Sequence, residues 1–253
     1  MTAEIATTLD AVLGGRLVLR QPRQGHRVGH DAILLAAATD ARAGQQAVDL
    51  GAGIGGAGLA LARRVPGLAV TLVEIDAELA ALAAENAARN ALADRVRALA
   101  CDAEDAGALA AAGLAAASVD RVLMNPPFND PRRQNVSPDA RRRLAHVGAP
   151  GLLARWVESA ARLIKPQGVL TLIWRADGLS DVLEALRGEF GAVAVLPVLP
   201  RPGAPAIRVL VRAVKGGQDG PVTLPGLLLN DDDNRPSAAA EAVLRGGEPL
   251  RLS

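Results

Sequence analysis

Several residue types are scarce in this 253-residue sequence, and each scarcity excludes something. The single cysteine, Cys101, excludes a disulfide framework and suits a reducing compartment. The first ten residues lack the apolar core of a secretory signal. The longest uncharged run, 106–119, is too short to cross a bilayer. We therefore expect a cytoplasmic protein without a membrane segment.

Excess charge of either sign is also missing. The chain has 28 basic and 27 acidic residues, for a net charge of +1, and only two of the basic residues are lysines, Lys165 and Lys215. A field this weak does not attract nucleic acid over the whole surface, so any such binding must come from a local patch. Half of the residues are hydrophobic, which is enough for a full core. No metal site is predicted.

Strand and helix patterns alternate along most of the chain. Short apolar runs predict strands at 46–50, 68–73, 95–100, 119–124 and 169–174, and helical periodicity or flanking prolines predict helices at 56–65, 76–92, 104–112, 151–164 and 179–186. Two last runs, 192–199 and 207–214, predict a closing hairpin. This alternation indicates an α/β fold with a mostly parallel sheet and helices on both faces.

The chain length fits one domain with three parts. Residues 1–44 are expected to form an N-terminal cap with a strand at 14–20 and a helix at 32–38. Residues 45–215 form the α/β core. Residues 216–253 form a C-terminal extension with weak local signals.

A glycine-rich turn follows the first core strand and precedes a helix. Glycines there let the backbone turn sharply and approach a ligand closely, and the helix N-terminus favours negative charge. Gly51, Gly53 and Gly56 also match the dinucleotide fingerprint, so an NAD enzyme is one alternative. Asp49 argues against it, because a carboxylate can face a cationic ligand but repels a pyrophosphate.

Two further acids end predicted strands. Glu74, at the end of the second core strand, can accept hydrogen bonds from ribose hydroxyls. Asp102 follows the third strand, where it can accept from an adenine amino group. Asp102 is equally well explained as the N-cap of a helix beginning near Glu104.

The most informative motif is Asn125-Pro126-Pro127-Phe128, directly after the fourth core strand. It lies at the carboxyl edge of the sheet, where α/β proteins bind ligands. The lone pair of an amino group conjugated to a ring is weakly nucleophilic. The Asn125 side-chain oxygen and the Pro126 carbonyl can accept from its two hydrogens and orient it for attack on a methyl group. Two prolines stiffen the backbone, and Phe128 offers a face for stacking a flat base.

A long polar segment, 129–149, follows this motif and is rich in arginine. It is either a solvated loop or an arm that contacts substrate phosphates. The second interpretation predicts an RNA-binding set: Arg132, Arg133, Arg141, Arg142 and Arg143.

These motifs, in this order, resemble the S-adenosylmethionine-dependent methyltransferases of class I that carry an Asn-Pro-Pro-aromatic motif. Together with the segment 13–38, they most resemble the bacterial tRNA adenine-N6 methyltransferases of the methyltransferase small-domain family. The resemblance covers roughly residues 13–214. It implies a Rossmann-like sheet of seven strands with the last antiparallel, S-adenosylmethionine as cofactor, and a tRNA substrate modified near the anticodon. The predicted cofactor site comprises Asp49, Gly51, Ala52, Gly53, Glu74, Ile75, Asp102, Ala103 and Asn125.

Other activities share the motif. Guanine-N2 rRNA methyltransferases and protein glutamine-N5 methyltransferases also act on a planar, conjugated amino group. The former usually resemble a duplicated fold, for which this chain is too short, and the latter usually have a separate helical domain before the core. A nucleotide-binding scaffold without activity is the alternative from another class, and it predicts a damaged motif where this one is intact.

Overall fold

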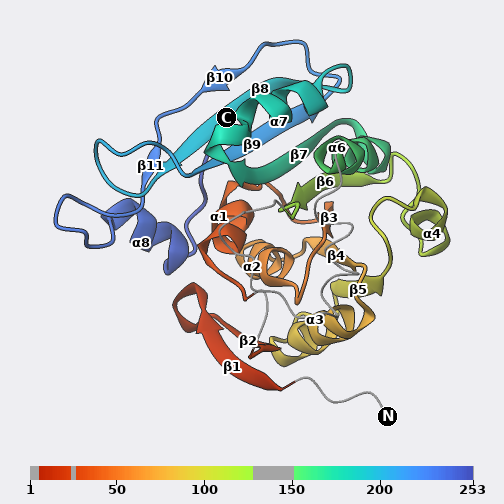
Figure 1. Cartoon of the computed structure of the whole chain (residues 1–253). Coiled ribbons are helices and arrows are strands. Elements are labelled where there is room, and N and C mark those ends of the chain that lie inside the picture. Colours follow the sequence, from red (N-terminus) through yellow and green to blue (C-terminus); the bar gives the residue numbers. More distant parts are fainter. Residues whose placement is uncertain (1–5, 24–26, 128–150, 253) are drawn as a thin grey trace.

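The computed structural model describes residues 6–23, 27–127 and 151–252. A large twisted sheet crosses the molecule with helices on both faces, and a small hairpin lies at one side (Figure 1). The strands are β1 (Thr7–Val12), β2 (Leu17–Pro22), β3 (Gln46–Leu50), β4 (Ala69–Glu74), β5 (Val96–Ala100), β6 (Val119–Met124), β7 (Ile164–Arg175), β8 (Phe190–Leu199), β9 (Arg208–Lys215), β10 (Val222–Thr223) and β11 (Leu227–Leu228). The helices are α1 (His30–Ala38), α2 (Gly56–Arg64), α3 (Ala77–Arg89), α4 (Ala106–Ala111), α6 (Leu152–Leu163), α7 (Leu179–Leu186) and α8 (Ala238–Leu244), with short 3-10 turns at Leu13–Gly15 and Ala176–Gly178.

The order of the strands confirms the predicted fold class. Neighbouring strands run β10-β8-β9-β7-β6-β3-β4-β5, and β11 also pairs with β8. β9 is antiparallel to both β7 and β8, and the other pairings in this sheet are parallel. The expected seven strands are therefore present with the last one antiparallel. Within the described ranges the sheet has nine strands, because β10 and β11 of the C-terminal extension add to β8.

Local signals explain where the core elements begin and end. The Asp76 side chain accepts from the backbone N–H groups of Glu78 and Leu79, which caps α3. α2 ends just before Val65-Pro66, where proline removes a backbone donor. β3 ends at Leu50, directly before Gly51, whose φ of 69° is in the left-handed region that favours glycine. Each boundary thus follows from residues within a few positions of it.

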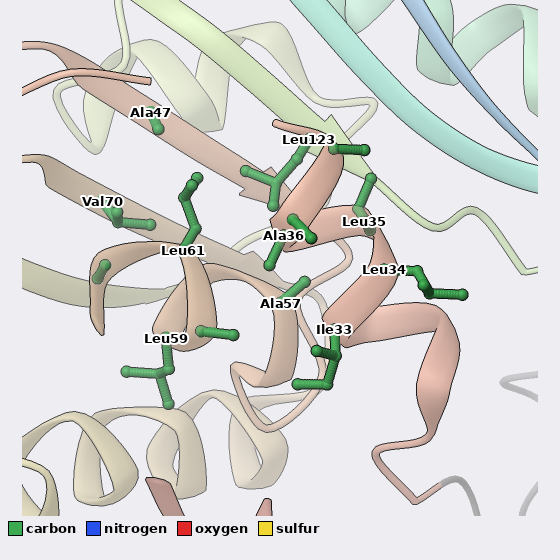
Figure 2. Packing of buried hydrophobic residues seen from close by; sticks show 14 of the residues in the cluster. Ile33, Leu34, Leu35, Ala36, Ala47, Ala57, Leu59, Leu61, Val70 and Leu123 are labelled. Carbon is green, nitrogen blue, oxygen red and sulfur yellow. The ribbon is translucent and has the colours of Figure 1, made fainter. Parts of the chain in front are cut away.

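Two apolar clusters fill the spaces above and below the sheet. The first lies beneath α1, α2 and α3, and Figure 2 shows residues of α1 and α2 gathered around Leu123 of β6. The second lies beneath α4, α6 and α7 and contains Val48, Val122 and Leu172. Successive side chains of a strand point to opposite faces, so the strands divide their apolar residues between both clusters.

Both ends of the described chain contain structure that local patterns did not predict. The strand expected at 14–20 is present as β2, which begins later, at Leu17, and pairs in antiparallel fashion with the unpredicted β1 around a turn at Leu13–Gly15. The C-terminal extension packs α8 against α1, and the Leu250 N–H donates to the Ala37 carbonyl at 2.9 Å. No helix in the described parts of the chain has the length and apolar character needed to cross a membrane.

Candidate functional site

The carboxyl edge of the sheet brings together the separate motifs of the sequence. β5, β4, β3 and β6 lie side by side and parallel, so their carboxyl ends form one edge. The chain leaves β3 through α2 to β4 on one side, whereas it leaves β6, the neighbour of β3 on the other side, through α6 to β7, so the direction of the connections reverses between β3 and β6. A crevice at such a switch point is where open α/β sheets bind ligands. Asp49, Glu74, Asp102 and Asn125 all lie at or next to this edge.

The glycine turn contains three left-handed residues with different surroundings. Gly51, Gly53 and Gly55 have φ angles of 69°, 56° and 89°. A Cβ at Gly51 would collide with the indole ring of Trp156 from α6, whereas nothing lies within 4 Å of a Cβ built at Gly53. Packing therefore requires the glycine at 51, and the open space at Gly53 leaves the backbone accessible to a ligand.

Glu74 joins the glycine turn to the turn after β4. Its Oε2 accepts from the Gly53 N–H at 2.8 Å and its Oε1 from the Asp76 N–H at 2.9 Å. Each carboxylate oxygen has two lone pairs, so both can still accept from a ribose hydroxyl. Ile75 follows with 55% of its surface exposed, which is unusual for a large apolar side chain. This pair can hold a sugar and an apolar ring side by side.

Asp49 faces the start of α2. Its side chain is 2% exposed, and its Oδ2 accepts from the Gly58 N–H at 2.8 Å. The pKa of Asp49 is raised to about 7, chiefly by burial and in smaller part by the nearby charge of Glu74, against the lowering effect of the Gly58 hydrogen bond. The described contact of this carboxyl group is therefore with the first turn of α2.

Asp102 closes a turn after β5. Its Oδ1 accepts from the Glu104 N–H at 2.9 Å. The expected alternative, that it caps a helix starting at Glu104, is wrong, because α4 begins at Ala106 and Asp105 is its N-cap. Ala103 is buried in the second apolar cluster, directly beside Asp102.

Asn125 follows β6 and is followed by a buried Pro126 and a half-buried Pro127. Its Oδ1 is buried, and it accepts no hydrogen bond from the part of the chain that the structure describes. Leaving a buried acceptor unpaired costs about 1–3 kcal/mol, so such an atom needs an explanation. Phe128 and the predicted RNA-binding arginines lie outside the described residues.

Three features of the site were missed by sequence reasoning. The indole of Trp156 packs against Gly51. Asp31 of α1 forms an ion pair with Arg208 of β9 at 2.9 Å. The fully buried Asn86 donates to the Ile54 carbonyl at 3.1 Å. The first two contacts join positions far apart in the sequence and leave no local signal. Asn86 does leave one, because an amide on the apolar face of a helix requires partners.

Several methyltransferases are similar to this chain. The family described as methyltransferase small domain matches residues 26–198. A tRNA1(Val) (adenine(37)-N6)-methyltransferase of Dickeya chrysanthemi is 29% identical over 87% of this chain and 86% of that protein. A release factor glutamine methyltransferase of Chlorobaculum tepidum is 29% identical over 64% of this chain and 56% of that protein.

A solved structure agrees with them. The crystal structure of a predicted O-methyltransferase from Agrobacterium tumefaciens superposes with a TM-score of 0.74 and 28% identity, over 87% of this chain and 98% of that chain. The fold class, the enzyme class and the S-adenosylmethionine cofactor expected from the sequence are thereby confirmed. The chain belongs to the methyltransferase small-domain family of S-adenosylmethionine-dependent enzymes.

Proposed function

We propose that this enzyme methylates the N6 amino group of an adenine in RNA, most specifically an adenine near the anticodon of a tRNA. The observation that carries the proposal is the buried Oδ1 of Asn125, directly after β6, which has no hydrogen-bond partner among the residues that the structure describes. The similarity to a tRNA adenine-N6 methyltransferase over most of both chains supports adenine as the target.

The cofactor is proposed to bind across the ends of β3, β4 and β5. The open Gly53, the free lone pairs of Glu74 and the exposed Ile75 fit the backbone approach, the ribose and the adenine of S-adenosylmethionine. The cofactor supplies an electrophilic methyl group when bound. The proposed set is Asp49, Gly51, Ala52, Gly53, Glu74, Ile75, Asp102, Ala103 and Asn125.

The target base is proposed to bind at Asn125, Pro126, Pro127 and Phe128. Asn125 Oδ1 and the Pro126 carbonyl would accept from the two amino hydrogens, which orients the nitrogen lone pair and stabilises the positive charge that develops on it. Asn125 is not a base, so the nitrogen loses its proton only after it gains the methyl group. Phe128 would stack on the base, which must leave its helix or loop stack to reach this edge.

Three wider proposals follow from the same assignment. Arg132, Arg133, Arg141, Arg142 and Arg143 would hold phosphates of the RNA, which makes its binding depend on salt. The chain would work as a single domain, with residues 1–44 as a cap, 45–215 as the catalytic core and 216–253 as an extension. Packing of β2 on α3 and of α8 on α1 supports this. The reaction would take place in the cytoplasm, where tRNA is modified.

The test is to incubate the enzyme with labelled S-adenosylmethionine and, in parallel, with unmodified total tRNA, rRNA and release factor. Digestion to nucleosides or peptides and mass spectrometry then identify the product. We expect N6-methyladenosine in tRNA. Methylguanosine in rRNA or methylglutamine in the release factor as the only product would refute the adenine assignment. Neither would affect the fold or the family.

A further inference from the structure

α3 lies beside the N-terminal hairpin (Figure 1). Two asparagines four positions apart, Asn86 in α3 and Asn90 at its C-cap, contact β2 of this hairpin. Asn86 is fully buried and Asn90 is 7% exposed. Asn86 Oδ1 accepts from the Arg20 N–H at 2.7 Å, and its Nδ2 donates to the Arg20 carbonyl at 3.0 Å. Asn90 forms the same pair with Val18, at 3.0 and 2.9 Å. The two amides thus act as a neighbouring strand along the edge of β2 that β1 leaves free.

The geometry of helix and strand makes this pairing possible. Four residues of an α-helix rise about 6.0 Å. Two residues of a strand rise about 6.6 Å, and residues two apart present their N–H and C=O groups to the same edge. Amides at positions i and i+4 of a helix can therefore match every second residue of a strand.

The two asparagines differ in one contact. The Nδ2 of Asn86 also donates to the Ile54 carbonyl in the glycine turn, at 3.1 Å. The Nδ2 of Asn90 instead donates to the Asn86 carbonyl within α3, at 2.8 Å. Asn86 therefore contacts both the hairpin and the glycine turn, whereas the side-chain hydrogen bonds of Asn90 within the described residues join it to the hairpin and to α3.

The contact with Ile54 completes a set of restraints on the turn. The peptide unit between Ile54 and Gly55 is held at its carbonyl by Asn86 and at its N–H by the Ala52 carbonyl, at 2.8 Å. The preceding Gly53 N–H is held by Glu74. Without these hydrogen bonds, a turn with three left-handed glycines would have much conformational freedom. Conformational freedom that is lost when a ligand binds weakens the affinity for that ligand. Asn86 removes part of that freedom before the ligand arrives.

We propose that Asn86 is a positioning residue for the cofactor turn, and that through it docking of the β1–β2 hairpin and binding of S-adenosylmethionine strengthen each other. The inference rests on the proposed cofactor site at Gly53 and Glu74. By linkage, whatever loosens the hairpin from α3 also loosens the turn, and a bound cofactor protects the hairpin to the same extent.

Asn86→Ala and Asn90→Ala form a matched pair for the test. Both remove two hydrogen bonds to β2, but only Asn86→Ala releases the Ile54 carbonyl. Calorimetric titration of the folded proteins with S-adenosylhomocysteine should show about tenfold weaker binding for Asn86→Ala and less than about twofold for Asn90→Ala. Hydrogen exchange gives a second readout. The ligand should slow exchange of the β2 segment in the wild type and in Asn90→Ala, and should do so much less in Asn86→Ala.

Glu74→Ala separates this inference from the site on which it rests. If Glu74→Ala binds the ligand as tightly as wild type, the proposed cofactor site is wrong, and the inference falls with it. If Glu74→Ala binds weakly while Asn86→Ala and Asn90→Ala bind equally, the site stands and the positioning role is refuted. Should Asn86→Ala not fold, Asn86→Asp and Asn90→Asp replace the pair. Both aspartates keep the acceptor for a β2 N–H and lose the donor to a β2 carbonyl, but only Asn86→Asp also loses the donor to the Ile54 carbonyl.

Discussion

At the ends of β3 and β4, the carboxylates accept hydrogen bonds from backbone N–H groups, whereas at the end of β6 the Asn125 oxygen accepts none from the described residues. The first region has the partners that fix its geometry before any ligand binds. The second has a buried acceptor whose partner must come from elsewhere. This difference suits a methyltransferase in which the rigid ends of β3 and β4 bind the cofactor, and in which the substrate supplies the missing hydrogen-bond partner at the end of β6.

Removal of the unpaired acceptor should have the largest effect. Asn125→Ala should lower turnover by about 10²- to 10³-fold, as deletion of one preorganised hydrogen-bonding group does in other enzymes. Cofactor affinity should fall much less, because the acceptor is proposed to face the base. Single-turnover methylation of a tRNA pool, beside a cofactor titration, separates the two effects. Full activity in Asn125→Ala would refute the proposed mechanism.

The cofactor half should respond in the opposite way. Glu74→Ala removes the acceptor for Gly53 and for the ribose and should weaken S-adenosylmethionine binding by about 1.5–3 kcal/mol, the worth of a hydrogen bond to a charged group. The exposed Glu78, in the first turn of α3, is the matched control, and Glu78→Ala should bind normally. Calorimetry measures both. Equal affinities in the two variants would show that Glu74 is an ordinary acid at a strand end.

The buried carboxyl group of Asp49 should make stability depend on pH. Its pKa is raised to about 7 by burial, so the folded state binds the proton more tightly than the unfolded chain does. This stabilising contribution is complete below the unfolded pKa near 4 and is lost as the pH rises through about 7. Asp49→Asn keeps an acceptor for Gly58 and does not titrate.

Urea unfolding at pH 5 and pH 7 tests this dependence. Between these values, the free energy of unfolding of the wild type should fall relative to that of Asp49→Asn by about 2 kcal/mol. A difference that stays constant with pH would mean that Asp49 titrates normally. Such a result would also weaken the contrast between the Asp49 carboxyl group, which the protein itself binds, and the Asn125 oxygen, which is left for the substrate.

The core and the carboxyl-edge motifs could be predicted because their signals are local. Most core strands contain a short apolar run that ends at or just before glycine, proline or an acid, and parallel strands bring those ends to one edge. β7 differs, because it extends over twelve residues and has a polar stretch directly after Ile164. The hairpin partner β1 and the added strands β10 and β11 were not predicted. β10 and β11 pair with β8, which is distant in the sequence, and strands as short as Val222–Thr223 carry no periodicity. β1 instead pairs with its neighbour β2 across the turn at Leu13–Gly15.

Two functional details also depended on tertiary context. Asp49 was expected to face a cationic ligand, and only the structure places its carboxyl group against Gly58 nine positions later. The ion pair of Glu85 on α3 with Arg20 of the hairpin, at 3.0 Å, likewise joins positions far apart in the sequence. A surface charge has many possible partners, so sequence spacing alone selects among them poorly.

The amide pair of α3 also limits how the length of this chain can change. Inserting one residue between Asn86 and Asn90 would rotate one amide about 100° around the helix and away from β2. One residue inserted between Val18 and Arg20 would turn one of their N–H groups towards β1. Insertions and deletions should therefore be excluded from these two short spans, which marks them as unsuitable places for loop grafts or circular permutation.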